Sequence, residues 1–340
     1  MTKAERMRAF DMRLPALMLL VGTGAALAAQ SSPLALKSVI PLPNVEGRID
    51  HLAFDGSRGR LYVAALGNNS VEVTDTVNGI HVTTLPGFHE PQGIAVIPGN
   101  AIDATNAIAV ANGSSGMLQL IDALSYQVRR TVVIGSDSDN VRYDQAAKRL
   151  YVAHEGGLAV VDPATGQIVQ RIAIPGHPES FQLEREGSRV FVNLPDSAQI
   201  VVADRKTASV VTRWPGTPRA NYPMALDEST HRLFVGYRQP ATMVVYDTAT
   251  GKAEATAPIP GDTDDLFYDS ARKRMYVIGG EGYVDVLQRN AGDAFKRVAR
   301  IATTTGARTG LFVPEQNRLY VAVPHRGMQF AEVRVYETRN

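Results

Sequence analysis

Four acidic residues occupy equivalent positions in a segment that recurs along this chain, each of them two residues before a short run rich in hydrophobic residues. They are Asp50, Asp139, Glu179 and Asp264. Carboxylate oxygens that converge from separate segments are the ligands that a hard divalent cation prefers, and Ca²⁺ is then the expected ion. The alternative is that Arg48, Arg219 and Arg308 neutralise these carboxylates pairwise, so that no ion binds.

Three residues at or near these positions are candidates for general acid–base chemistry: His51, Glu179 and His154. An imidazole or carboxylate beside a bound cation is the arrangement of a metal-assisted hydrolase or lyase, in which the ion acts as Lewis acid. A metal site built on His51, His154 or His177 is less favoured, because no H-x-H or H-E-x-x-H pair places two histidines close together. The cofactor expectation is therefore none, or Ca²⁺ or another divalent cation.

The same positions also fit a site that binds a ligand without turnover, and this is the favoured interpretation. Its candidate ligand-binding residues are Asp50, Gln92, Asp139, Asn140, His177, Tyr222, Arg308 and His325. The chain has no cysteine, which excludes a cysteine nucleophile and thiolate metal sites. It also has no G-x-S-x-G, phosphate-loop or dinucleotide motif, so those enzyme classes lack local support.

These residues must be positioned by a unit that repeats seven times. Each copy contains a hydrophobic triplet: LYV (61–63), IAV (108–110), LYV (150–152), VFV (190–192), LFV (233–235), MYV (275–277) and LYV (319–321). An alternating segment follows each triplet, and five of these segments end in an acid that can cap the next turn: Asp75, Asp122, Asp162, Asp204 and Asp247. Four short strands in about 43 residues predict one blade of a β-propeller.

Seven such units predict an all-β fold, a seven-bladed β-propeller of four-stranded antiparallel blades. The seventh unit has only three strands before the chain stops, whereas 35–42 precede the first unit without a partner. We therefore expect the segment 35–42 to complete the last blade and to close the ring. The main insertion, 98–106, is expected to lengthen a hairpin in the second blade.

In such a ring the loops that lead into the innermost strands open on one face, around the central channel. The candidate residues fall in or beside these loops or the loops between second and third strands of a blade. The segment 212–223 is expected to be a long loop of this kind, in which Trp214 packs between blades and Tyr222 faces the channel.

The repeat resembles the YVTN β-propeller family, also called YncE-like, across the whole chain after the leader. The tetrapeptide of that family survives loosely as YVAA (62–65), AVAN (109–112), YVAH (151–154) and FVNL (191–194), with the turn D-x-x-T-G at 162–166 and 247–251. The resemblance implies an exported seven-bladed propeller, and related propellers include lactonases, lyases and interaction scaffolds. Quinone-dependent dehydrogenases commonly have eight blades and signature tryptophans, which this chain lacks.

The first 28 residues read as a secretory signal peptide, with basic residues followed by an apolar run of about 15 residues that ends at Ala28. We expect cleavage near Ala28, a single propeller domain over 29–340, and a periplasmic or secreted protein without a membrane span. The whole chain carries a net charge of +1, so no nucleic-acid partner is expected. The expected partner is a small molecule or an envelope protein or peptide, bound by a monomer.

Overall fold

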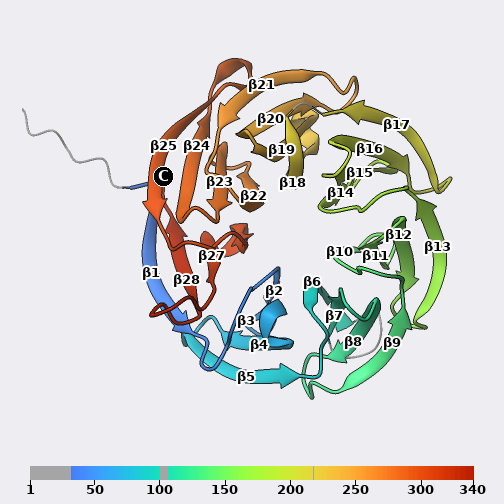
Figure 1. Ribbon diagram of the computed structural model, residues 1–340, viewed down its shortest axis with the longest axis vertical. Coiled ribbons are helices and arrows are strands. Elements are labelled where there is room, and N and C mark those ends of the chain that lie inside the picture. The colour runs from blue at the N-terminus through green and yellow to red at the C-terminus, as the bar shows by residue number, and fades with distance from the viewer. Residues whose placement is uncertain (1–31, 100–105, 217) are drawn as a thin grey trace, which may run out of the picture. The chain divides into compact units, whose positions relative to one another are not determined.

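The computed structural model describes residues 32–99, 106–216 and 218–340. The predicted leader and most of the insertion at 98–106 lie outside these residues. The described chain forms seven four-stranded antiparallel sheets, arranged as the blades of a ring (Figure 1). The predicted seven-bladed β-propeller is therefore confirmed.

The first four blades follow one another along the chain. Blade 1 contains β2 (Leu52–Asp55), β3 (Arg60–Ala65), β4 (Ser70–Asp75) and β5 (Ile80–Pro86), and blade 2 contains β6 (Pro91–Ile97), β7 (Ala107–Asn112), β8 (Met117–Asp122) and β9 (Val128–Val133). Blade 3 contains β10 (Val141–Asp144), β11 (Arg149–His154), β12 (Gly157–Asp162) and β13 (Gln167–Ala173). Blade 4 contains β14 (Phe181–Leu183), β15 (Arg189–Leu194), β16 (Gln199–Asp204) and β17 (Ser209–Pro215).

The remaining three blades complete the ring. Blade 5 contains β18 (Arg219–Asp227), β19 (Arg232–Gln239), β20 (Ala241–Asp247) and β21 (Ala253–Pro258), and blade 6 contains β22 (Thr263–Asp269), β23 (Arg274–Gly279), β24 (Tyr283–Arg289) and β25 (Phe295–Ala302). Blade 7 contains β26 (Gly310–Val313), β27 (Arg318–Val323), β28 (Glu332–Thr338) and β1 (Leu34–Pro41). Short 3-10 turns lie at η1 (Leu66–Asn68), η3 (Glu228–Thr230), η4 (Ala291–Asp293) and η5 (Pro314–Gln316).

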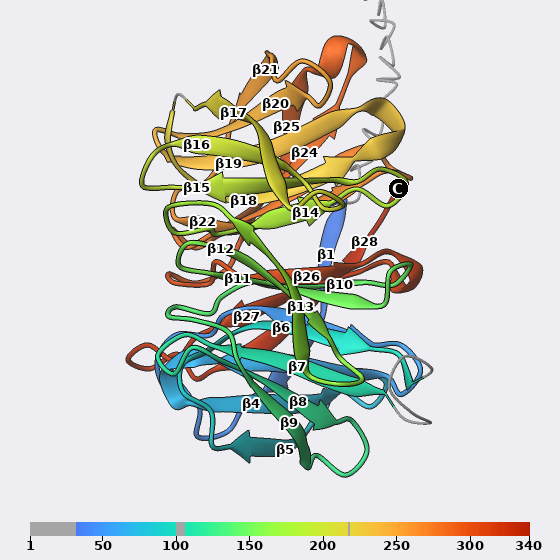
Figure 2. The same ribbon diagram turned by 90° about the vertical axis from the view of Figure 1, so that its right-hand side faces the viewer.

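The strand sequences follow from their place in a blade. The second strand of each blade is buried on both faces by neighbouring blades, which explains the continuous hydrophobic triplets. The outermost strands instead alternate between half-buried and exposed residues, as in β5. The core therefore consists of hydrophobic clusters between adjacent blades, such as the one between blades 4 and 5. Figure 2 shows the blades from the edge of the ring.

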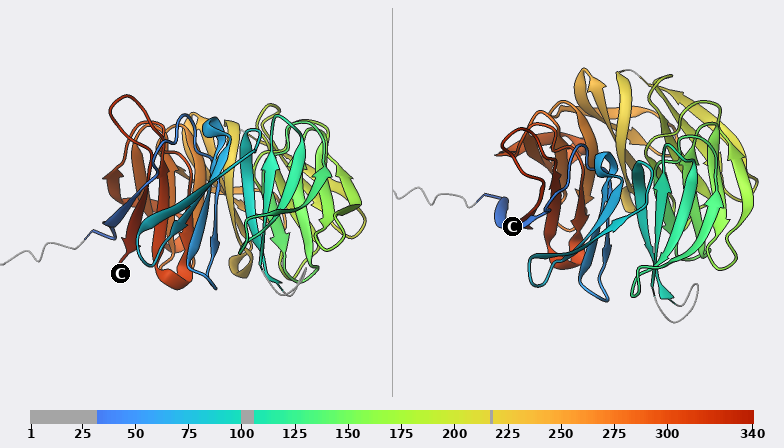
Figure 3. Two further views of the ribbon diagram at one scale, coloured as in Figure 1. Left: turned by 90° about the horizontal axis from the view of Figure 1, so that it is seen from below. Right: turned by 60° about the horizontal axis from the view of Figure 1, so that its bottom comes forward.

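The ring is closed by the N-terminal strand. β1 pairs with β28 in antiparallel register, from Leu34 opposite Thr338 to Pro41 opposite Glu332, and in Figure 3 the two strands lie side by side. Ile40 is fully buried in the cluster that joins blades 7 and 1. The strand predicted at 35–42 thus completes the last blade, because pairing removes a free sheet edge at the point where the chain's two ends meet.

The predicted acid at the end of each third strand caps the following turn. Asp75 Oδ1 accepts hydrogen bonds from the backbone N–H groups of Val77 and Asn78, both at 2.9 Å. Asp204 Oδ1 does the same for Lys206 and Thr207, both at 2.8 Å. The repeated Asp is therefore a turn-forming residue in these blades and lies away from the central channel.

The expectation of a long loop over 212–223 was wrong. β17 continues to Pro215 and β18 begins at Arg219, so most of this segment is strand. The hydrophobic face of Trp214 explains the difference: its ring packs on Phe191 at 5.7 Å and Tyr246 at 6.1 Å between blades 4 and 5. This packing extends the outer strand of blade 4 up to the start of the next blade.

Within the described residues the helices are short 3-10 turns, and none has the length and hydropathy needed to cross a membrane.

Candidate functional site

A polar cavity of about 340 Å³ lies where the inner strands of all seven blades begin, and we call it the mouth cavity. Its lining residues are Arg48 and Leu66 of blade 1, Glu90 and Gln92 of blade 2, Asp137 and Asp139 of blade 3, His177 and Glu179 of blade 4, Tyr222 and Arg238 of blade 5, Asp264 of blade 6 and Arg308 of blade 7. A narrower space of about 10 Å³ shares four of these residues and is also lined by Asp50, His51, Asn140 and Ser180. It has room for about one water-sized group.

The same backbone arrangement places the lining residues in several blades. Asp139 N–H donates to the Ala153 carbonyl at 2.9 Å, and Ala153 N–H donates back to the Asn140 carbonyl at 2.9 Å. The equivalent pair in blade 1 joins Asp50 and His51 to Ala64, at 2.8 and 3.0 Å. These bonds fix the residues just before each inner strand, so the side chains come from rigid positions rather than from free loops.

Gly93 occupies the matching position in blade 2, and its lack of a side chain is required there. A Cβ atom at this residue would lie 2.2 Å from the carbonyl oxygen of Asp139 and 2.7 Å from the backbone nitrogen of Val141. Blades 2 and 3 therefore approach through backbone contact, which draws the Asp139 strand toward the channel.

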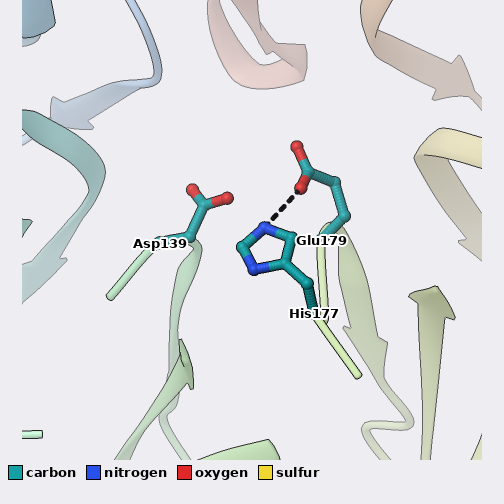
Figure 4. A group of neighbouring side chains, drawn as sticks. All are labelled: Asp139, His177 and Glu179. Carbon is teal, nitrogen blue, oxygen red and sulfur yellow. Dashed lines mark hydrogen bonds and ion pairs between the residues drawn. The ribbon is translucent and has the colours of Figure 1, made fainter. Parts of the chain in front are cut away.

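Asp139, His177 and Glu179 form the most compact group of potential metal ligands (Figure 4). One ligand atom from each residue lies within 4.8 Å of the others. His177 Nε2 contacts Glu179 Oε2 at 3.1 Å, and His177 Nδ1 contacts Asp137 Oδ2 at 3.2 Å. The hydrogen bond to Glu179 outweighs the effect of burial and raises the pKa of His177 to about 9, so His177 is an imidazolium here.

Asp139 is the most perturbed acid of this group. It is 4% exposed, and no described residue donates a hydrogen bond to its side chain. Burial raises the pKa of Asp139 well above its ordinary value, and the nearby Glu179 and Asp50 carboxylates raise it further. A bound cation would relieve this repulsion, and two carboxylates with one imidazole form a donor set that suits Zn²⁺ or Mn²⁺ better than Ca²⁺, which prefers oxygen ligands throughout.

The other two predicted metal ligands lie in separate ion pairs. Asp264 contacts Arg238, and its Oδ2 lies 3.5 Å from Arg308 Nε. Burial nevertheless raises the pKa of Asp264 to about 7. Arg238 also stacks on Tyr222, with its Cζ atom 3.6 Å from the ring centroid. Asp50 is paired with Arg48 at 3.4 Å. The expected neutralisation by Arg48 and Arg308 therefore describes these two acids, but Arg238 rather than Arg219 is the third arginine.

His51 lies beneath the mouth cavity between two carboxylates. Its Nδ1 is 3.5 Å from Asp265 Oδ2 and its Nε2 is 3.8 Å from Asp50 Oδ1. Burial alone would lower the pKa of His51, but Asp265 and Asp50 outweigh it and raise the pKa to about 10. Beside it, the Asn140 side chain is 1% exposed, and its Oδ1 atom has no hydrogen-bond partner. A buried acceptor left open at this position favours a donor supplied by a ligand or a water molecule.

Two predicted site residues lie away from the mouth cavity. His154 Nδ1 donates to the Glu155 carbonyl at 2.7 Å and its Nε2 accepts from Arg171 at 3.2 Å, and burial lowers the pKa of His154. His325 contacts Glu46 at 2.5 Å and stacks on Phe330 in the β27–β28 loop. Neither histidine lines the cavity, so the structure does not bring them together with His51 or Glu179.

Sequence reasoning missed Leu66, Glu90, Asp137 and Arg238 as lining residues. Arg238 lies near the end of β19, three residues beyond the hydrophobic triplet at 233–235, because β19 and β20 pair further than the corresponding strands of other blades. Asp137 belongs to the link between blades 2 and 3, where the chain has no repeat signal. Only the spacing of charged residues beyond the triplets could have drawn attention to Asp137 and Arg238.

The fold and the cavity define a seven-bladed β-propeller with a charged central mouth. Two curated proteins, "Uncharacterized protein YncE" from Salmonella typhimurium (strain LT2) and from Salmonella typhi, are each 22% identical over 182 residues, 51% of this chain. The match covers 51% of each relative, so the chain spans about half the length of the curated relatives it matches. No family model matches the chain.

A chain in the crystal structure of a mitotic checkpoint complex superposes with a TM-score of 0.72, 12% identity and 99% coverage of both chains. At this identity the likeness shows the fold alone. The sequence match and the seven blades together confirm the resemblance to YncE-like propellers that the repeat predicted.

Proposed function

We propose that this chain is a binding propeller that holds a small polar ligand with a cationic group in its mouth cavity, without chemical turnover. The observation that carries the proposal is the distribution of charge in the cavity lining. Four acidic side chains come from the consecutive blades 2, 3 and 4, whereas the arginines come from blades 5, 7 and 1, with Asp264 of blade 6 between two of them. A concave site with convergent charged groups from every blade is the usual form of a ligand pocket.

The two sides differ in how far their charges are already paired. Arg48 is paired with Asp50, Arg238 with Asp264, and Arg308 with Asp262 at 2.9 Å. Among the described residues, the four carboxylates of the acidic side, from Glu90, Asp137, Asp139 and Glu179, are contacted by a single cation, His177, which lies between Asp137 and Glu179. The remaining negative charge favours an amine or a similar cation, and Asn140 and Tyr222 offer polar groups beside it.

The test is a thermal-shift screen of the purified protein against amines, amino acids and short basic peptides. A ligand present at about one hundred times its Kd should stabilise the protein by about 2.7 kcal/mol. Glu179→Gln should remove most of this shift, whereas Glu254→Gln, an exposed acid on β21, should keep it. A panel without hits, or a shift that survives Glu179→Gln, contradicts the proposal. Hits confined to peptides would identify an envelope partner as the ligand.

A second candidate function is that of a metal-assisted hydrolase or lyase. The compact group Asp139, His177 and Glu179 favours it, because these residues are suited to hold a divalent cation. Such an ion would supply a Lewis acid, and the protein would supply charge and orientation around it. Asp264, with its pKa raised to about 7, is the carboxylate placed to exchange a proton on the opposite wall.

Metal analysis separates the two functions. One equivalent of divalent metal in the purified protein, lost in Asp139→Asn with Glu179→Gln and kept in Glu254→Gln, would support the enzyme. Hydrolysis of a lactone from a substrate panel, abolished when a chelator is added, would further support the enzyme. Metal-free protein that still binds amines would support the binding function.

We also propose that the chain is exported by its leader and acts as a monomer in the periplasm or outside the cell. The basic and apolar pattern of residues 1–28 supports this placement. Detection of the mature N-terminus near residue 29 by mass spectrometry of the secreted fraction would test it. A full-length cytoplasmic product would contradict it.

A further inference from the structure

A second cavity lies at the far end of the inner strands of blades 3 and 4. β10 and β14 begin at the mouth cavity, and the groove of about 650 Å³ is formed where they end. The residues that matter for its chemistry are Arg142, Tyr143, Asp144, Gln182, Glu184 and Arg185. We call it the lower groove. It shares no lining residue with the mouth cavity.

Both acids of the lower groove are already neutralised from within the protein. Asp144 forms an ion pair with Arg205, which also donates to the Gly187 carbonyl at 2.7 Å. Glu184 is 9% exposed and accepts a hydrogen bond from Arg189 Nε at 2.9 Å. These carboxylates are therefore fixed by arginines outside the groove lining and leave little negative charge for a ligand.

The guanidinium groups of both arginines of the lower groove are, by contrast, without an acidic partner among the described residues, although the Arg185 backbone N–H donates to Glu228 Oε1 at 2.8 Å. Arg142 donates one hydrogen bond, from Nη1 to the Val141 carbonyl at 3.0 Å, and its guanidinium lies over the Phe181 ring at 5.6 Å. The side chain of Arg185 is exposed and forms no hydrogen bond or ion pair within the described residues. Each guanidinium has five N–H donors, so most of them are free.

The partly buried position of Arg142 makes the unpaired positive charge of its guanidinium energetically unfavourable. Burial lowers the pKa of Arg142, and the carboxylates that oppose this effect, Asp265 and Asp139, act from a distance without contact. Arg142 is half-buried, and a guanidinium withdrawn from water is normally balanced by a carboxylate or by another anion. The protein supplies no such group from the groove, whose acids are engaged elsewhere.

We propose that the lower groove is a second binding site, for a small oxyanion of the carboxylate or phosphate class, with Arg142 as its central ligand and Arg185 at its rim. A guanidinium matches the two oxygens of such an anion with a pair of parallel hydrogen bonds. Tyr143, whose hydroxyl has no described partner, lines the same groove and can donate a further bond. This site lies beyond the mouth cavity and does not depend on the function proposed for it.

Isothermal titration calorimetry of the whole protein with inorganic phosphate, and separately with citrate, at low ionic strength tests the proposal. We expect one site, and the tighter probe tells phosphate from carboxylate ligands. Arg142→Gln should weaken binding about tenfold or more, since it removes a charge-assisted pair of hydrogen bonds. Arg185→Gln should weaken it less, and Arg130→Gln, an exposed arginine of β9 with the same change in charge, should leave it unchanged.

Two further variants keep the test decisive. Arg142→Lys retains the charge, so it should bind the anion more tightly than Arg142→Gln if both show the circular dichroism of the wild-type fold. Arg308→Gln changes the mouth cavity and should leave the affinity as it is. Binding lost in Arg308→Gln and kept in Arg142→Gln would overturn the proposal, as would the absence of binding by both probes.

Discussion

Positive charge beneath the mouth cavity is carried by a buried histidine. The His51 side chain is 15% exposed and lies between Asp50 and Asp265, so its imidazolium balances two largely buried carboxylates. Removal of this proton would leave the acids facing each other across a neutral ring. The stability of the central channel should therefore depend on pH through His51 more than through any exposed histidine.

We predict that His51→Gln flattens the pH dependence of stability. The pKa of His51 rises from 6.5 to about 10 on folding, so its stabilisation is complete below pH 6.5 and disappears as the pH rises toward 10. The variant should lose on the order of a few kcal/mol near neutral pH. Urea unfolding from neutral to alkaline pH measures this, with His89→Gln, an exposed histidine, as control. An unchanged slope in His51→Gln would refute the assignment.

Asp139 should have the opposite effect on stability. Its carboxylate is buried, lacks a hydrogen-bond donor among the described residues and is repelled by Glu179 and Asp50. Asp139→Asn should therefore raise the free energy of unfolding above neutral pH by about 1 kcal/mol or more. A gain in stability on loss of a charged group marks a residue kept for binding. A lower urea midpoint for the variant would argue that Asp139 has a structural role.

At the level of the strand, the ring depends on the pairing of β1 with β28. Ile40 and Val39 are neighbours in β1, yet they face opposite sides of the sheet. Ile40 is fully buried between blades 7 and 1, whereas Val39 is 37% exposed. This contrast allows the contribution of the closing strand to be measured within a single element.

Ile40→Ala should lower the free energy of unfolding by about 2–5 kcal/mol, because it leaves a cavity at the junction of the ring. Val39→Ala removes a similar side chain from the surface and should change it by less than about 0.5 kcal/mol. Chemical denaturation of the two variants makes the comparison. Equal effects would mean that β1 does not pack against the core as described.

Blades 2 and 3 provide a second test at this scale. Gly93→Ala places a Cβ atom 2.2 Å from the Asp139 carbonyl oxygen, so one of the two strands must move. We expect a loss of more than about 2 kcal/mol in stability, together with weaker ligand binding in the mouth cavity. Gly56→Ala, where a Cβ would make only ordinary contacts with Phe54, is the control. Wild-type stability in Gly93→Ala would contradict the close approach.

At the level of the molecule, the period of the triplets predicted the number of blades, because each buried second strand must be hydrophobic on both faces. The segment 35–42, which has no partner in the first unit, predicted closure of the ring. A strand left unpaired would expose its backbone N–H and C=O groups. The number of blades and the closing strand both follow from short-range patterns of hydrophobic residues, and the structure confirms both.

The site was harder to predict because it joins residues that are far apart in the sequence. The repeat predicted that four acids, Asp50, Asp139, Glu179 and Asp264, lie on one face of the ring. The pairing of Asp50 with Arg48 and of Asp264 with Arg238 depends instead on side-chain geometry. His177 joins Asp139 and Glu179 across two blades, which no local spacing indicates. Arg142, whose guanidinium has no acidic partner among the described residues, lies in an inner strand, where the repeat gave no reason to expect a charge.

The most direct test of the account is a crystal structure of the protein with the strongest ligand from the thermal-shift screen. We predict density for that ligand in the mouth cavity, with its cationic group in contact with Asp139 or Glu179 and the seven blades unchanged around it. Density for the ligand only outside the ring, with the cavity filled by ordered water, would contradict the claim that this propeller binds through its central mouth.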